Sequence, residues 1–492
     1  MEKNMITVNK KVTERVKTIE ISGDIIVPDI KPDIISIITT NGNAYIYKEE
    51  ISKSRLRMDG NVDAYVIYLS ENGETKSIQT TLNFIENIDD DSIFDNMIAK
   101  NKVTLANVET KILNERKITV RANIEIKCEF FESTCIEIFN KFDELEDIEK
   151  LEESMKVKSI IGMNKVKSSI KENINIDETL EAVEILKTSI MLSNYESKIS
   201  YNKVLAKADA NVKIMFLTGD SLVKTVEETF PIMSFIEVEN ISENNMCDID
   251  YVVRNMLFKI NSKEMHSINC QIDFDANCET YESVDINIIQ DMYGINRDVQ
   301  FSKKEVEVQL DTLPTVENMK LEEKILVENI SLIYDVDYRI SVLNKKVVGS
   351  AVNYEGEVQL WIYYEADSKT GLNIKEAKIP FFTKVSAECK SIDIKVASKQ
   401  FDLSSEYVNS SIELQIIQTS MNLKKINIIE NIEQKDLQES SDYTMSIYFV
   451  KAGDTIWNIA KKFKVSMENI VRTNTLENPD MINIGDKLYI VR

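Results

Sequence analysis

Residues 59–68 read DGNVDAYVIY, and two later stretches of the chain repeat this pattern at a constant spacing. They are KADANVKIMF at residues 207–216 and EGEVQLWIYY at residues 355–364, each 148 residues after the one before. Spacings of 148 and 149 residues also link three shorter landmarks, LNF at 82–84, FPI at 230–232 and IPF at 379–381. A period of this size predicts three tandem domains of one kind.

Each unit reads as β structure. Residues 118–126, ITVRANIEI, alternate apolar and polar side chains as a half-buried strand requires, and HSINCQIDF follows 148 residues later. The denser apolar runs at 62–68 and 358–364 favour central strands covered on both faces. We expect mainly antiparallel β sandwiches or small barrels, with hairpin turns at 72–73 and 218–220. Short helices are expected at residues 92–100 and 318–327.

Composition excludes several classes of function. The 492 residues include 59 basic and 82 acidic side chains, a net charge of −23, which disfavours nucleic acids and anionic membranes as partners. His266 is the single histidine, so a histidine-based triad or metal site cannot form within one chain. No P-loop or dinucleotide-binding motif occurs. We therefore predict no enzyme, cofactor, metal site or catalytic residue, although a paired-carboxylate site stays a distant alternative.

Targeting signals are also missing from the sequence. The N-terminus has no apolar signal segment, and the densest aliphatic stretch, residues 34–38, is too short to cross a bilayer. The six cysteines include no C-x-x-C pair, as expected for small apolar residues in a reducing compartment. These features favour a cytoplasmic protein without a transmembrane segment.

Composition also suggests where the units end. The repeats are expected at residues 8–141, 154–290 and 300–429, with a run of seven acidic residues between 142 and 153 as a solvated connector. Residues 430–445 are polar and read as a flexible linker. A separate module is expected at 446–492.

This last module has its own pattern. Residues 447–463 predict a strand, a turn at Gly453 and a helix capped by Asp454 or Thr455. Ser466 then caps a second helix, and a final strand covers 487–491. The order is β-α-α-β in fewer than fifty residues. Its net charge is +2, against −25 for the rest of the chain, which suits an adaptor that engages a separate partner.

The module resembles a LysM domain. Its GDTIWNIA at 453–460 is similar to the family's opening motif, and NTLENPDMINIG at 474–485 to its closing motif, although Ala452 stands where the family usually has proline. LysM domains generally bind N-acetylglucosamine polymers in a shallow groove. The resemblance implies binding residues at Gly453, Asp454, Thr455, Ile456, Trp457, Asn478, Pro479, Asp480, Met481 and Ile482. For Trp457, packing in the module core is the favoured interpretation.

The repeats resemble the SPOCS domains of spore proteins. The resemblance rests on VPDIKPDI at 27–34 and on the strand at 59–68; the second repeat is the most diverged, with Ala208 in place of the glycine. SPOCS units followed by LysM are typical of spore coat morphogenetic proteins. This resemblance implies a non-enzymatic adaptor in the mother-cell cytoplasm, at the forespore surface. There its LysM would bind the basement-layer coat ATPase, stage IV sporulation protein A, and promote coat encasement together with other coat proteins.

The alternative function is a protein of the spore cortex or cell wall that binds peptidoglycan through N-acetylglucosamine. Residual affinity for this glycan is also compatible with the adaptor role. Tyr68, Trp361 and Tyr364 could be interaction anchors in the repeats, but packing of a β strand is the favoured interpretation.

Overall fold

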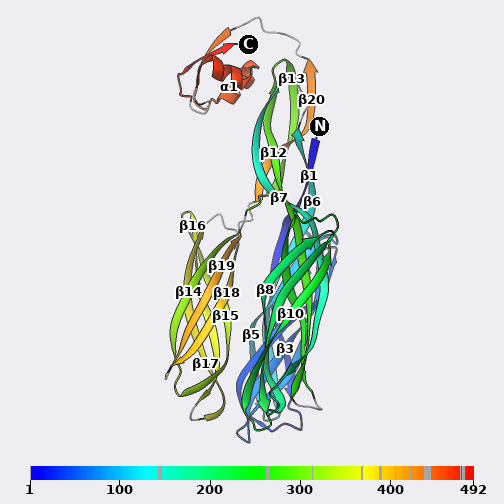
Figure 1. Cartoon of the computed structure of the whole chain (residues 1–492), viewed down its shortest axis with the longest axis vertical. Coiled ribbons are helices and arrows are strands. Elements are labelled where there is room, and N and C mark those ends of the chain that lie inside the picture. The colour runs from blue at the N-terminus through cyan, green and yellow to red at the C-terminus, as the bar shows by residue number, and fades with distance from the viewer. Residues whose placement is uncertain are drawn as a thin grey trace.

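A computed structural model gives the architecture of the chain. It describes residues 2–141, 147–261, 266–312, 314–366, 369–386, 391–404, 406–419, 423–436, 445–476, 478 and 482–491. The molecule is elongated, with long β strands below and a small helical module at the upper end (Figure 1). The expected mainly β fold with a C-terminal β-α-α-β module is confirmed.

The first repeat is a sandwich of two antiparallel three-stranded sheets, in the orders β2-β3-β4 and β1-β6-β5. Its strands are β1 (Glu2–Ile26), β2 (Ile34–Ser52), β3 (Arg55–Ser70), β4 (Thr75–Asp89), β5 (Ile98–Asn114) and β6 (Lys117–Lys141). β3 contains the quoted stretch 59–68 and is buried on both faces over most of its length, as the sequence predicts. The apolar side chains of both sheets form one core.

The second repeat has the same two-sheet plan, and the third has it together with a separate two-stranded sheet, β13-β20. Repeat 2 contains β7 (Ile148–Asn175), β8 (Ala182–Ser200), β9 (Lys203–Thr218), β10 (Val223–Glu237), β11 (Met246–Ile260) and β12 (Ser267–Gly294). Repeat 3 contains β13 (Arg297–Gln309), β14 (Thr315–Leu326), β15 (Ile330–Val348), β16 (Ala351–Ala366), β17 (Lys369–Ser386), β18 (Ser391–Ser404), β19 (Tyr407–Thr419) and β20 (Leu423–Asp436). The expectation of antiparallel sandwiches therefore holds for all three units.

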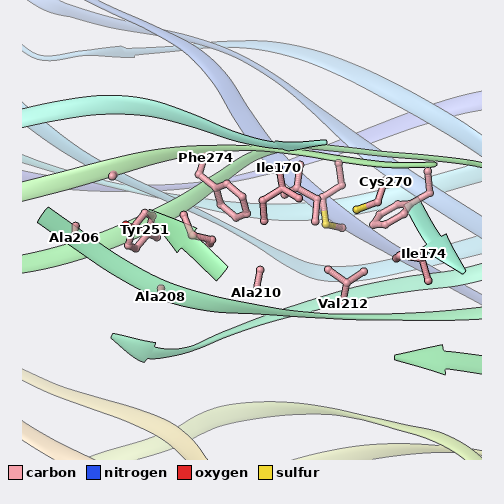
Figure 2. Close-up of a cluster of buried hydrophobic side chains, with 14 of the residues drawn as sticks. Ile170, Ile174, Ala206, Ala208, Ala210, Val212, Tyr251, Cys270 and Phe274 are labelled. Carbon is pink, nitrogen blue, oxygen red and sulfur yellow. The ribbon is translucent and has the colours of Figure 1, made fainter. Parts of the chain in front are cut away.

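The core of repeat 2 combines large and small side chains. Phe274 and Ile170, from β12 and β7, point toward the alanines of β9 (Figure 2). Cys270 lies between the sheets as a buried free thiol, and burial raises its pKa to about 12. A thiol with so high a pKa is unreactive, so this cysteine acts as a small apolar residue, as predicted.

A size match across neighbouring strands explains the glycine of the repeat pattern. Gly60 faces Phe84, and a Cβ at Gly60 would overlap both that ring and the carbonyl oxygen of Tyr45. Gly356 faces Phe381 in the same way. In repeat 2 the corresponding pair is Ala208 and Ile232. The larger residue on one strand is thus accommodated by the smaller partner on the next.

The three repeats meet through equivalent positions. Ile38, Leu186 and Tyr334 are 148 residues apart, as are Ile67, Met215 and Tyr363, and all six belong to one hydrophobic cluster. The β-bulges also lie at equivalent positions of the three repeats. The register shifts after Ile34, Ala182 and Ile330 in the pairs β2–β3, β8–β9 and β15–β16, respectively. The repeats are therefore packed around a shared axis, with like faces inward.

A buried charge network lies at this junction. Lys187 of repeat 2 is 4% exposed and forms ion pairs with Asp335 and Asp337 of repeat 3. Lys213 reaches Asp335 at 2.9 Å, and the Lys187 ammonium also lies 4.6 Å from the centre of the Tyr363 ring. Because a buried charge is stable only when it is paired, these contacts fix repeat 3 against repeat 2.

Beyond the sandwiches, each repeat extends one two-stranded arm. The arms are residues 2–10 with 132–141, 148–160 with 281–294, and β13 with β20. Their inward side chains form a separate apolar core: Ile6, Val8, Ile136, Ile138, Val157, Ile286, Ile288, Val308, Ile426 and Ile428. The three arms together connect the sandwiches to the C-terminal module.

The prediction of two helices inside the repeats is wrong. Residues 90–97 form two separate turns before β5, and residues 315–326 are strand β14. Met319, Leu321 and Ile325 are the least exposed residues of β14, at spacings of two and four that suit one face of a strand. Pairing with β19 thus overrides the helix propensity of its glutamates and lysines.

The two expected connectors are shorter than composition suggests. β7 already begins at Ile148, and Glu153 pairs there with Lys424 of β20. β20 continues to Asp436, so residues 430–436 are strand instead of linker. The remainder of both segments, residues 142–146 and 437–444, lies outside the described residues.

Candidate functional site

The C-terminal module is built from two short helices on a two-stranded sheet. β21 (Met445–Phe449) pairs with β22 (Lys487–Val491). Thr455 caps α1 (Ile456–Phe463) by accepting a hydrogen bond from the amide of Asn458, and Ser466 caps α2 (Met467–Thr473) through the amide of Asn469. Of the two predicted caps for α1, Thr455 is the one that forms. Neither helix is long enough to cross a membrane.

Asp454 shapes the turn that precedes α1. Its carboxylate accepts hydrogen bonds from the amide of Lys451 and from the hydroxyl of Tyr448, both at 2.8 Å, and these bonds lower its pKa. Gly453 has φ +85°, a left-handed conformation that other residues adopt only with strain. The turn is thereby fixed, and Gly453 and Thr455 are left exposed on its surface.

Trp457 lies in the core and also joins the module to the arm of repeat 2. Its side chain is 6% exposed, and its ring packs edge-on against Tyr293 of β12 with 5.0 Å between centroids. The indole nitrogen donates to Asp291 at 2.8 Å, and Lys461 contacts the same carboxylate at 2.6 Å. Tyr293 donates to the carbonyl oxygen of Val465 at 2.7 Å. The module is therefore docked on the tip of β12.

Electrostatics support this docking. Burial opposes ionisation of Asp291, but hydrogen bonds from Lys461 and Trp457 outweigh this effect and lower its pKa. A second contact joins Lys464 to Asp298 at 3.5 Å. Lysines at the C-terminal end of α1 thus face the carboxylates of Asp291 and Asp298 at the end of the arms.

The predicted binding residues fall into three groups. Gly453, Thr455 and Asn478 are exposed and Asp454 is half-buried. Ile456 and Trp457 are buried, and Ile482 packs against the same cluster. Pro479, Asp480 and Met481 lie outside the described residues. The exposed members lie in the loops before α1 and after α2, whereas Trp457 faces the body of the molecule.

Two segments of the chain match known family models. Residues 448–491 match the LysM domain, and residues 181–261, from β8 to β11, match the SPOCS domain of SipL. The chain carries a SPOCS domain and a LysM domain. The SPOCS match falls on repeat 2, which has the least regular sequence pattern of the three.

Two relatives match the chain over short segments. The chain is 47% identical over 47 residues to the spore coat assembly protein ExsA of Bacillus cereus, which covers 9% of this chain and 7% of that protein. It is 51% identical over 43 residues to the secreted LysM effector ECP6 of Passalora fulva, which covers 9% of this chain and 19% of the effector. The chain thus spans a small part of either relative. No solved structure matches it.

Sequence reasoning missed the partners of the LysM domain within its own chain. Asp291 and Tyr293 precede Trp457 by more than 160 residues, and no local pattern distinguishes them from other residues of a strand. The difference in net charge between the basic module and the acidic rest of the chain was the one sequence signal for a partner of the LysM domain. It indicated a separate partner, yet part of that complementarity is satisfied inside the molecule.

Proposed function

We propose that this chain is a non-enzymatic adaptor of spore coat assembly that acts in the mother-cell cytoplasm at the forespore surface. Its LysM domain would bind the coat ATPase, stage IV sporulation protein A, while the SPOCS repeats provide a rigid body that also contacts other coat proteins. The combination of a SPOCS domain with LysM, and the similarity to a spore coat assembly protein, support this role.

The observation that carries the proposal is the two-sided LysM domain. One side, with Trp457 and Lys461, is held by Asp291, and the turn with Gly453 and Thr455 is left exposed. Figure 1 shows the module at the end of the arms, far from the hairpin loops at the lower end of the sandwiches. A ligand can therefore reach the turn at Gly453 and Thr455 without meeting those hairpin loops.

We assign the contact to the loops 453–456 and 478–482, including Pro479, Asp480 and Met481. Trp457 belongs to the same predicted set, but its indole is occupied by Asp291 and Tyr293. A partner would reach this side chain only after the module left β12. The proposed primary contact is thus the pair of loops.

Capture of purified coat ATPase tests the assignment. The unaltered chain should retain the ATPase, whereas a chain ending at Ser440 should lose it. Asn478→Arg, which places a bulky charge on the exposed loop, should weaken capture about tenfold or more. Asn87→Arg, the same exchange at an exposed position of β4, should have no effect. Equal capture by the truncated chain would move recognition to the SPOCS repeats.

Glycan binding is the second candidate. The similarity to a LysM effector and the exposure of Gly453 and Thr455 in the turn favour it. Titration with N-acetylglucosamine oligomers, followed by calorimetry, separates the two. Saturable binding that Asn478→Arg removes would support a cortex or cell-wall role; retention of the ATPase without glycan binding would support the adaptor.

A further inference from the structure

Two cysteines of repeat 2 lie on neighbouring strands with their side chains together. Cys247 of β11 pairs in register with Thr280 of β12, and Cys278 pairs with Ile249, so the cysteines are diagonal neighbours across one antiparallel pair. Both side chains are on the inner face, because Cys278 belongs to the core of repeat 2 and Cys247 packs against that core. Both are free thiols, and a side-chain hydrogen bond joins them.

The two sulfur atoms differ in chemical character. Hydrogen bonds from Cys278 and from the hydroxyl of Ser197 outweigh the burial of Cys247 and lower the pKa of its thiol. The hydrogen bond to Cys247, together with burial, raises the pKa of Cys278. Because the thiolate is the nucleophilic form of cysteine, Cys247 is the attacking sulfur and Cys278 is a protonated thiol beside it. The buried thiols of Cys128 and Cys270 are unlike Cys247, since burial raises the pKa of each to about 12.

A small oxidant has access to these strands. Cys247 is half-buried, whereas Cys278 is only 2% exposed. A cavity of 520 Å³ at the boundary of repeats 1 and 2 is lined by Cys278 together with Asp248 and Glu279, the residues that follow the two cysteines. A molecule of the size of hydrogen peroxide therefore fits beside the pair.

We propose that Cys247 and Cys278 are a redox modification site, which a peroxide converts into a reversible disulfide. The Cys247 thiolate attacks one peroxide oxygen, so that an S–O bond forms, the O–O bond breaks and the departing oxygen leaves as water after taking up a proton. Cys278 then attacks the sulfur of this sulfenic acid, an S–S bond forms, and a second water leaves with the Cys278 proton. Two thiols are thus oxidised to one disulfide, and one hydrogen peroxide is reduced to two water molecules.

The position of β11 in its sheet allows the bond to close. Diagonal neighbours on paired strands lie farther apart than residues directly opposite each other, so the S–S bond requires a small shift of one strand. In the sheet order β11-β12-β7, β11 is the edge strand and β12 is its neighbour on one side. An edge strand shifts more easily than a central one because only one ladder of hydrogen bonds holds it.

The disulfide acts on ion pairs that join repeats 1 and 2. Asp248 and Glu279 both pair with Lys158, at 3.1 and 3.0 Å, and Glu279 also pairs with Lys100 of repeat 1 at 3.0 Å. Since these carboxylates directly follow the two cysteines, oxidation holds them in place and stiffens the junction of repeats 1 and 2. This role does not depend on the function proposed for the LysM domain.

Peptide mapping of the oxidised full chain tests the proposal. Cys135, which is exposed on β6, and Cys389, which lies outside the described residues, are first replaced by serine so that neither can join two chains. Hydrogen peroxide should then give two peptides joined through Cys247 and Cys278, and dithiothreitol should separate them. In the same sample, Cys247 should be oxidised at least about tenfold faster than Cys270.

Variants of the same chain identify the roles of the two thiols. Cys247→Ala should leave Cys278 as resistant to peroxide as Cys270. The matched control is Cys270→Ala, which removes another buried thiol of β12 and should leave the joined peptides unchanged. Hydrogen exchange of residues 246–253 should slow in the oxidised chain and recover after reduction. Oxidation of Cys247 to sulfinic acid without joined peptides, or oxidation of Cys247 no faster than that of Cys270, would overturn the proposal.

Discussion

Replacing Asp335 with asparagine tests the junction where the three repeats meet. Burial alone would raise the pKa of Asp335, but the ammonium groups of Lys187 and Lys213 lower it from 3.8 to about 2. At about 1.36 kcal/mol per pKa unit, this difference corresponds to about 2 kcal/mol of stability at neutral pH. Lys187 also pairs with Asp337 at 2.6 Å. Because the variant retains Asp337, the larger cost of an unpaired buried ammonium does not arise. We expect a loss of about 2 kcal/mol.

Hydrogen exchange of β8 and β15 measures this loss directly. An opening free energy lower by about 2 kcal/mol makes exchange of their protected amides about 30-fold faster. The control is Asp393→Asn, which removes an exposed pair with Lys395 inside repeat 3 and should cost under about 1 kcal/mol. Exchange unchanged by Asp335→Asn, or changed equally by both variants, would refute the reasoning.

The pH dependence has a defined sign. Because the pKa of Asp335 is lower in the folded chain, its contribution is complete above its ordinary pKa of 3.8 and is lost as the pH falls through about 2. The difference between the unaltered chain and the variant should therefore shrink over this range.

Three other changes are predicted. Asp291→Ala should weaken the docking of the LysM domain by about 1–2 kcal/mol, since it removes a charged acceptor from Trp457 and Lys461. In a Trp361→Phe background, acrylamide should then quench the fluorescence of Trp457 more strongly. The control Asp298→Ala should increase this quenching far less. Gly60→Ala should destabilise repeat 1 by about 1–3 kcal/mol through overlap with Phe84 and the Tyr45 carbonyl, whereas Ala208→Gly should cost under about 1 kcal/mol; urea unfolding compares them. Asp454→Asn should weaken the turn before α1 by about 1 kcal/mol, visible as a lower midpoint of the Trp457 transition; an unchanged midpoint would contradict the role given to Asp454.

Much of the architecture could be predicted because the three copies of the repeat can be aligned with one another within the one sequence. The spacing of 148 residues places 59–68, 207–216 and 355–364 in β3, β9 and β16, the central strands of equivalent sheets. Helix caps and turn glycines likewise allowed the order of strands and helices in the LysM domain to be predicted. These features depend on residues that are close in sequence.

The remaining features depend on contacts between distant parts of the chain. Residues 318–327 contain good helix formers, and only pairing with β19 makes most of them a strand. The arms have ordinary alternating patterns, so nothing local shows that three of them share a core. The binding residues were predicted by resemblance, and the contact of Trp457 with Asp291 could not be, since it joins two domains.

The threefold-related positions at the junction hold Thr39, Lys187 and Asp335, one residue of each kind. Three identical chains arranged around an axis would have to place the same side chain at all three points, so three lysines or three aspartates would repel one another there. Covalent linkage removes that constraint. Because each copy can differ, a cation and an anion occupy equivalent places and attract each other there. The tandem chain can therefore hold an ion pair at positions where a symmetric trimer could place only three like residues.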